Sequence, residues 1–60
     1  MNKFYLADGT LVEKTAHGKL IVWVPKSLSE EVHDFWKQAS INKEVGDENE
    51  NAFAYCILAD

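Results

Sequence analysis

The pattern of apolar and polar positions along the chain begins with a β-hairpin over residues 3–14. Two apolar-rich runs flank the pair Asp8-Gly9. A type I′ turn needs positive φ at both central residues, so an Asp-Gly pair between such runs is a strong hairpin signal. With that pair as the whole loop, Tyr5 faces Val12 across the hairpin, and both side chains lie on the same face of the sheet.

A third strand is expected over residues 19–24, after a turn in which Gly18 has positive φ. β-Branched and aromatic residues dominate this run. Side chains alternate between the two faces of a strand, so Ile21 and Trp23 share one face and the remaining apolar residues share the other. Pro25 ends the strand because it has no N–H to donate to a neighbouring strand.

An amphipathic helix is expected next. Ser27 and Glu30 have the spacing of a capping box, which predicts the start of the helix. Apolar residues then recur at helical spacing and predict one stripe that faces the sheet. The stripe consists of Leu28, Val32, Phe35, Trp36 and Ala39. His33 is expected on the opposite, solvated side, and the helix is expected to end between Ala39 and Val45.

The rest of the chain predicts an acidic loop over residues 44–51 and a final element over residues 52–59. Apolar residues alternate in the final segment as in a strand, whereas three alanines and an Asp47-x-x-Glu50 cap spacing also suit a short helix. The strand is favoured and would run parallel to the first and third. The chain is therefore expected to be one α+β domain, residues 1–60, of order β-β-β-α-β. Its small antiparallel or mixed sheet would pack on one helix.

The length of the chain, 60 residues, predicts a marginal core. A domain of this size buries only about 60% of the surface that its unfolded chain exposes. Cys56 is the only cysteine, so no disulfide within the chain can compensate, and a reducing, cytoplasmic location is expected. No apolar run approaches the roughly 20 residues needed to span a bilayer. Association with another protein surface is the remaining way to stabilise the fold.

Both faces of the predicted sheet carry large apolar side chains, whereas one helix covers one face. At about 25 cal/mol per Å² of apolar area, leaving the second face in water forgoes several kcal/mol. Contiguous patches of this kind mark interfaces, and a symmetric homodimer is the simplest cover. The alternative is that strand twist and the C-terminal segment cover the second face within one chain. The interface candidates are Trp23, Ile21, Tyr5 and Val12.

Charge and candidate chemistry favour a binding protein over an enzyme. The net charge is −4, and six lysines without any arginine make nucleic acid an unexpected partner. Glu30 and His33 have the spacing of one half of a di-iron site, but that site needs a second such pair and two further glutamates. His17, His33 and Cys56 have no zinc-binding spacing. We therefore expect no catalytic residue, metal, cofactor or small-molecule substrate, and interpret the chain as a protein-interaction or regulatory module.

One segment resembles a known family. Residues 20–25, Leu-Ile-Val-Trp-Val-Pro, followed by Leu-Ser-Glu-Glu-Val over 28–32, resemble the strand-proline-helix opening of ribbon-helix-helix transcriptional regulators. In that family two strands pair across a dimer and place side chains in the DNA major groove. The resemblance implies a dimeric DNA-binding regulator as the alternative function. Ile21 and Trp23 stand at the outward positions, which are polar or basic in that family.

Overall fold

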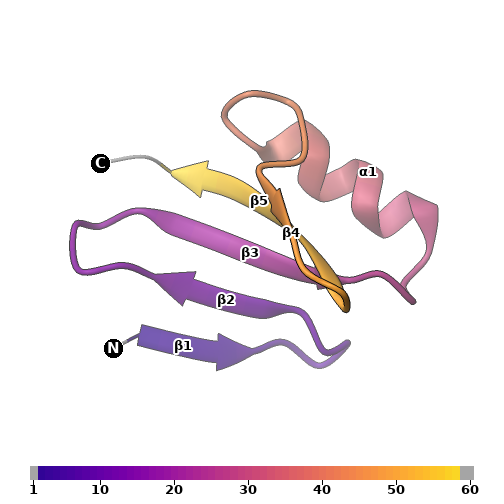
Figure 1. The fold of residues 1–60 in the computed structure, drawn as a ribbon, viewed down its shortest axis with the longest axis horizontal. Helices are drawn as coiled ribbons and strands as arrows, with labels where there is room; N and C mark the ends of the chain where they lie inside the picture. Colours follow the sequence, from indigo (N-terminus) through magenta and orange to yellow (C-terminus); the bar gives the residue numbers. More distant parts are fainter. Residues whose placement is uncertain (1, 59–60) are drawn as a thin grey trace.

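Residues 2–58, described by a computed structural model, form one antiparallel sheet of five strands and one helix (Figure 1). The elements in chain order are β1 (Asn2–Tyr5), β2 (Leu11–Lys14), β3 (Leu20–Pro25), α1 (Glu30–Ala39), β4 (Asp47–Glu48) and β5 (Ala52–Leu58). The strands lie in the order β1-β2-β3-β5-β4, so β1 and β4 are the two edges. The predicted α+β class is confirmed, and the last segment is a strand.

The first hairpin has a three-residue loop instead of the predicted two-residue loop. The N–H of Leu6 donates to the carbonyl of Thr10 (2.8 Å), and the N–H of Gly9 donates to the carbonyl of Leu6 (3.1 Å). Gly9 has a φ of 95°, whereas Asp8 is not among the residues with positive φ. This is the loop in which a β-turn is followed by a left-handed glycine, and it contains Ala7 in addition to the Asp-Gly pair.

The extra loop residue shifts the register of the hairpin by one position. Tyr5 pairs with Leu11, and Phe4 pairs with Val12. The predicted pairing of Tyr5 with Val12 is therefore wrong. Because side chains alternate along a strand, the shift places Val12 on the opposite face from Tyr5 and puts Leu11 beside Tyr5.

The Asp8 side chain holds the loop in place. Its Oδ1 accepts a hydrogen bond from the N–H of Thr10 (2.9 Å), and this bond holds the pKa of the carboxyl below its ordinary value of 3.8. A lowered pKa means that the bond stabilises the fold above pH 3.8 and that this contribution is lost as the pH falls through the lowered value. We expect the urea midpoint of the wild type to fall more steeply below about pH 4 than that of Asp8→Asn, in which the acceptor is uncharged. Parallel acid profiles for the two proteins would contradict this role.

β3 is the central strand and separates the two faces as predicted. Val22 and Val24 are buried on the side of α1, while Ile21 and Trp23 lie on the other side. The turn before β3 uses the same type of three-residue loop as the first hairpin, and Gly18 has the expected positive φ of 88°. Both edges of β3 are hydrogen-bonded, to β2 and to β5.

The helix begins two residues later than predicted. Ser29, rather than Ser27, is the N-cap, and its hydroxyl accepts from the N–H of Val32 (3.4 Å). The end at Ala39 agrees with the prediction. The side that meets the sheet is also rotated relative to the predicted stripe. Val32 and Trp36 pack against the core, but Phe35 is 64% exposed.

The final strand runs antiparallel to β3, not parallel as predicted. The residues that were expected to form only a loop contain β4, which pairs antiparallel with β5. The chain after α1 therefore runs through β4 in the direction of β3, and the tight turn over residues 49–51 reverses it into β5. Asn49 Oδ1 accepts from the N–H groups of Asn51 and Ala52 (both 2.7 Å) and so stabilises this turn.

Candidate interaction surface

His33 joins the helix to the sheet, contrary to the prediction that it is solvated. Its Nε2 lies 2.9 Å from the carbonyl of Pro25, and its Nδ1 lies 3.1 Å from the hydroxyl of Tyr55. A carbonyl can only accept, so Nε2 carries the hydrogen and Nδ1 accepts from the Tyr55 hydroxyl. The imidazole also meets the ring of Phe53 edge-on, at 5.6 Å between centroids. Both ring nitrogens are thus used to hold the fold.

Tyr55 fills the core between β5 and α1 and is 2% exposed. Burial, with a smaller effect from the charge of Asp34, raises the pKa of the Tyr55 hydroxyl above its ordinary value of 10.0. The neutral phenol therefore contributes stability that is complete below pH 10.0 and is lost as the pH rises through the raised pKa. We expect Tyr55→Phe to lose less stability than the wild type between about pH 9 and pH 11 in urea titrations. Equal losses of stability in the two proteins would show that folding does not raise the pKa of the Tyr55 hydroxyl.

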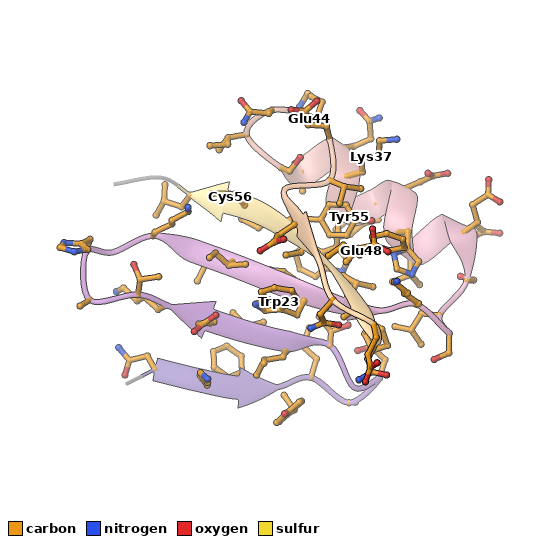
Figure 2. All side chains as sticks on the ribbon, viewed as in Figure 1. Trp23, Lys37, Glu44, Glu48, Tyr55 and Cys56 are labelled. Carbon is orange, nitrogen blue, oxygen red and sulfur yellow. The ribbon has the colours of Figure 1, made fainter. Side chains whose placement is uncertain are left out.

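The face of the sheet that points away from α1 carries three of the four predicted interface residues. Tyr5, Ile21 and Trp23 lie on this face, and Leu11 joins them between Tyr5 and Trp23. Trp23 and Tyr55 consequently lie on opposite sides of the sheet (Figure 2). The fourth candidate, Val12, is 9% exposed and belongs to the core under α1. Its place on the helix-free face is taken by Leu11.

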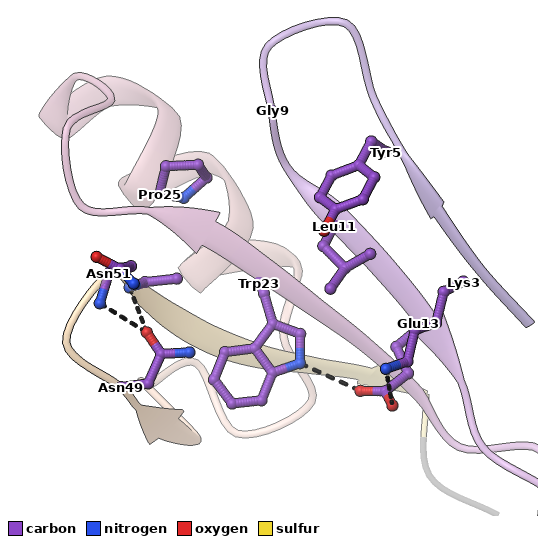
Figure 3. Close-up of a pocket in the computed structure, with 10 residues that line it drawn as sticks. Lys3, Tyr5, Gly9, Leu11, Glu13, Trp23, Pro25, Asn49 and Asn51 are labelled. Atoms are coloured by element: carbon purple, nitrogen blue, oxygen red, sulfur yellow. Dashed lines mark hydrogen bonds and ion pairs between the residues drawn. The ribbon is translucent and has the colours of Figure 1, made fainter.

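Trp23 is partly sheltered by the chain itself. β4 is the edge strand beside β5, and the turn that follows it lies beside the indole (Figure 3). Ala52 and Ala54 are buried, and Ala54 is the β5 partner of Trp23. The indole Nε1–H donates to Glu13 (3.2 Å). Trp23 and Ile21 are half-buried as a result.

An open depression of about 390 Å³ remains on the helix-free face, between Trp23 and β1. Its apolar wall is formed by Tyr5, Leu11 and Trp23, and its polar rim includes Lys3 and Glu13 (Figure 3). The charges on the rim are paired, because Lys3 Nζ lies 3.9 Å from the Glu13 carboxylate. The depression is therefore a shallow apolar surface beside β1 rather than a site with free reactive groups.

All four residues of β1 are exposed, and two of them, Phe4 and Tyr5, are aromatic. Phe4 is 58% exposed, Tyr5 is 72% exposed and Leu6, directly after the strand, is 37% exposed. The alternation of the strand places Phe4 and Leu6 on the helix side and Tyr5 on the helix-free side. Both faces of this edge strand thus present apolar side chains to solvent.

The helix side adds a second open groove near the first hairpin. It has a volume of about 570 Å³ and is lined by residues of α1, including Val32, Phe35 and Trp36, and by Asp8 of the first loop. The ring of Phe35 meets Trp36 edge-on at 5.2 Å between centroids. Phe4 and Phe35 are not among the interface candidates predicted from the sequence. The uninterrupted apolar run Phe4-Tyr5-Leu6, which cannot place every side chain on one face, was the available signal.

Charge is distributed unevenly over the molecule. Residues 2–26, which form β1 to β3, contain four lysines and two carboxylates. Residues 27–58, which contain α1, β4 and β5, have two lysines and seven carboxylates. The exposed apolar edge at β1 therefore lies in the weakly basic half. No helix within residues 2–58 is long and apolar enough to cross a membrane.

The remaining candidates for chemistry do not assemble into a site. In the described part of the chain, no three His, Cys, Asp or Glu side chains lie close enough to hold a metal ion. Cys56 is a half-buried free thiol whose Sγ contacts the carbonyl of Leu58 at 3.6 Å. Comparison with protein families, curated proteins and solved structures finds no match to this chain. The apolar surface around β1 is the candidate functional site.

Proposed function

We propose that this protein is a cytoplasmic protein-binding module without catalytic activity, and that it binds a second copy or another protein through the surface around β1. One observation carries the proposal. Phe4, Tyr5 and Leu6 are consecutive, apolar and exposed, and the first two belong to an edge strand whose outer side has no neighbour among residues 2–58. An exposed hydrophobic edge strand is a template for pairing with another chain.

The energy available at this surface supports the proposal. Aromatic side chains such as Phe4 and Tyr5 can each bury about 150–250 Å². At about 25 cal/mol per Å², covering both recovers several kcal/mol, which is comparable to the total stability expected of a domain this small. A partner that covers β1 therefore supplies a substantial fraction of the free energy of folding.

The titratable groups with close partners support a binding role over a catalytic one. His33 uses both ring nitrogens between Tyr55 and Pro25. Glu13 accepts from Trp23 and pairs with Lys3. Each of these groups holds one element against another, which gives it a structural role in the fold.

The geometry of β3 does not favour the alternative of a ribbon-helix-helix regulator. In that family the strand before the helix pairs with the same strand of a second protomer. Here β3 already pairs with β2 on one side and β5 on the other. Its outward residues, Ile21 and Trp23, are half-buried beside β4 instead of being free to enter a groove of DNA.

The proposal is tested with Tyr5→Lys and Phe4→Asp, which remove the apolar edge while changing only exposed side chains. The wild type is expected to self-associate in sedimentation equilibrium or to retain a specific protein from a lysate of the native cell, and both variants are expected to do neither. Lys14→Glu, an exposed change on β2, serves as the control. Wild type that neither self-associates nor retains a partner, or variants that behave like wild type, would refute the proposal.

A further inference from the structure

We infer that β1 pairs antiparallel with β1 of a second copy of this chain and so joins two sheets into one. This inference rests on the proposed function, because it names the partner of the same surface. The N–H of Leu6 points inward to Thr10. Backbone groups alternate in direction along an antiparallel strand, so the N–H and C=O groups of Lys3 and Tyr5 point outward. They form the free edge to which another strand can bond.

Symmetry and charge select one register for this pairing. A two-fold axis at Lys3 would place two lysines directly opposite each other, which is destabilising. An axis at Tyr5 would form only one hydrogen-bonded pair, because Ala7 already lies in the loop. An axis at Phe4 pairs Lys3 with the partner's Tyr5 at both ends and forms four backbone hydrogen bonds. This is the register in which every outward group of β1 has a partner.

The same register gives each aromatic ring of β1 a neighbour. Phe4 lies opposite the partner's Phe4 on the helix side. The two residues form a non-hydrogen-bonded pair of the antiparallel ladder, in which the side chains lie close together. Aromatic pairs across strands stabilise a sheet. On the helix-free side, Tyr5 lies opposite the partner's Lys3, where an ammonium group can approach the ring. Both aromatic residues of β1 are therefore covered.

Charge also favours β1 over the other edge. β4 consists of Asp47 and Glu48, so its pairing with itself would bring carboxylates together. Joining at β1 keeps the acidic halves at opposite ends of the combined sheet. The two β5 strands would then be seven strand spacings apart, about 34 Å, which exceeds the screening length of about 8 Å at physiological salt. The repulsion between the acidic halves is thereby minimised.

Sedimentation equilibrium of chemically synthesised chains tests the backbone pairing. N-methylation of the Tyr5 amide removes an outward donor from each protomer and leaves the bonds between β1 and β2 in place. We expect the wild type to be a dimer and N-methylation of Tyr5 to weaken dimerisation at least about tenfold. N-methylation of Glu48, whose N–H bonds the Asp47 carboxylate (2.8 Å) on the other edge, is the control and should leave dimerisation unchanged.

Disulfide trapping tests the register. In a Cys56→Ser background, Phe4→Cys should form a symmetric disulfide in an oxidised glutathione buffer, because facing residues without backbone hydrogen bonds have Cα atoms about 4.5 Å apart. Tyr5→Cys should not cross-link to itself, but should cross-link to Lys3→Cys when the two variants are mixed. All three cysteine variants lie on β1, so they differ only in their position in the proposed register.

The outcomes separate this inference from the proposed function. A dimer that is weakened by N-methylation of Tyr5 and trapped through Phe4→Cys supports it. A dimer that cross-links through Tyr5→Cys alone, or that is indifferent to N-methylation, overturns β1 pairing and leaves a protein-binding module. A chain that stays monomeric also overturns it. In that case only the capture experiment with Tyr5→Lys decides whether the module binds another protein.

Discussion

Tyr55→Ala is expected to unfold the protein at 25 °C. Tyr55 is the largest of the fully buried side chains and contacts both layers of the fold. Truncating a buried aromatic residue costs about 3–5 kcal/mol, and a core of this size supplies about the same amount. The loss of the far-UV circular dichroism of the sheet and of protection from hydrogen exchange would show this. The protein concentration must be held constant, because any association raises the apparent stability.

Tyr55→Phe is the matched control for that prediction. The ring remains in the core, but Nδ1 of His33 loses the hydroxyl that donates to it at 3.1 Å. The expected cost is about 1–2 kcal/mol in urea unfolding, because one partner of a partly buried hydrogen bond is removed. A folded Tyr55→Ala protein, with stability near that of Tyr55→Phe, would contradict the central role of the ring.

Trp23→Ala is expected to lower the free energy of unfolding by about 2–3 kcal/mol, below the cost of truncating a fully buried ring. The indole is half-buried between Leu11 and the turn after β4, and its partner on β5, Ala54, is too small to fill the space. Trp23 thus shelters the helix-free face as part of the fold. Urea titration followed by circular dichroism measures the effect.

The comparison of Trp23 with Tyr5 separates stability from binding. Tyr5→Ser, at a residue that is 72% exposed, should change stability by less than about 0.5 kcal/mol and should weaken association. Trp23→Phe keeps an aromatic ring and loses the bond to Glu13 (3.2 Å), so its cost should stay near 1 kcal/mol. If Trp23→Ala were as stable as wild type but monomeric, Trp23 would belong to the interface instead.

The spacing of apolar residues correctly predicted which side chains face the core where that spacing repeated along a strand. The alternation in Leu20–Pro25 predicted that Val22 and Val24 face the core, and both are buried. The same spacing predicts the helix with a start two residues too early and places His33 on the solvated side, whereas His33 faces the sheet. The imidazole ring packs against Phe53, and two hydrogen bonds, to Pro25 and Tyr55, satisfy its nitrogens inside the fold. Only the neighbouring strands could provide those partners.

An error of one residue in the predicted length of the first hairpin loop changed one of the interface candidates. The Asp-Gly signal located the first turn correctly, but it did not reveal whether Ala7 belongs to the strand or to the loop. That single residue decides the face on which Val12 lies. Tyr5, Ile21 and Trp23 share a face as expected, whereas the exposure of Phe4 depends on how far α1 reaches across the sheet.

Local sequence patterns were enough to predict the α+β class, the approximate positions of β2, β3, β5 and α1, and the excess of apolar residues over what one helix covers. These features follow from local periodicity and turn chemistry. The tertiary structure decided which apolar residues remain exposed. The turn after β4 lies beside Trp23 and α1 packs mainly against β5, so the excess collects at Phe4, Tyr5 and Leu6. Exposure depends on the distant segments that pack on a residue, and no local pattern encodes them.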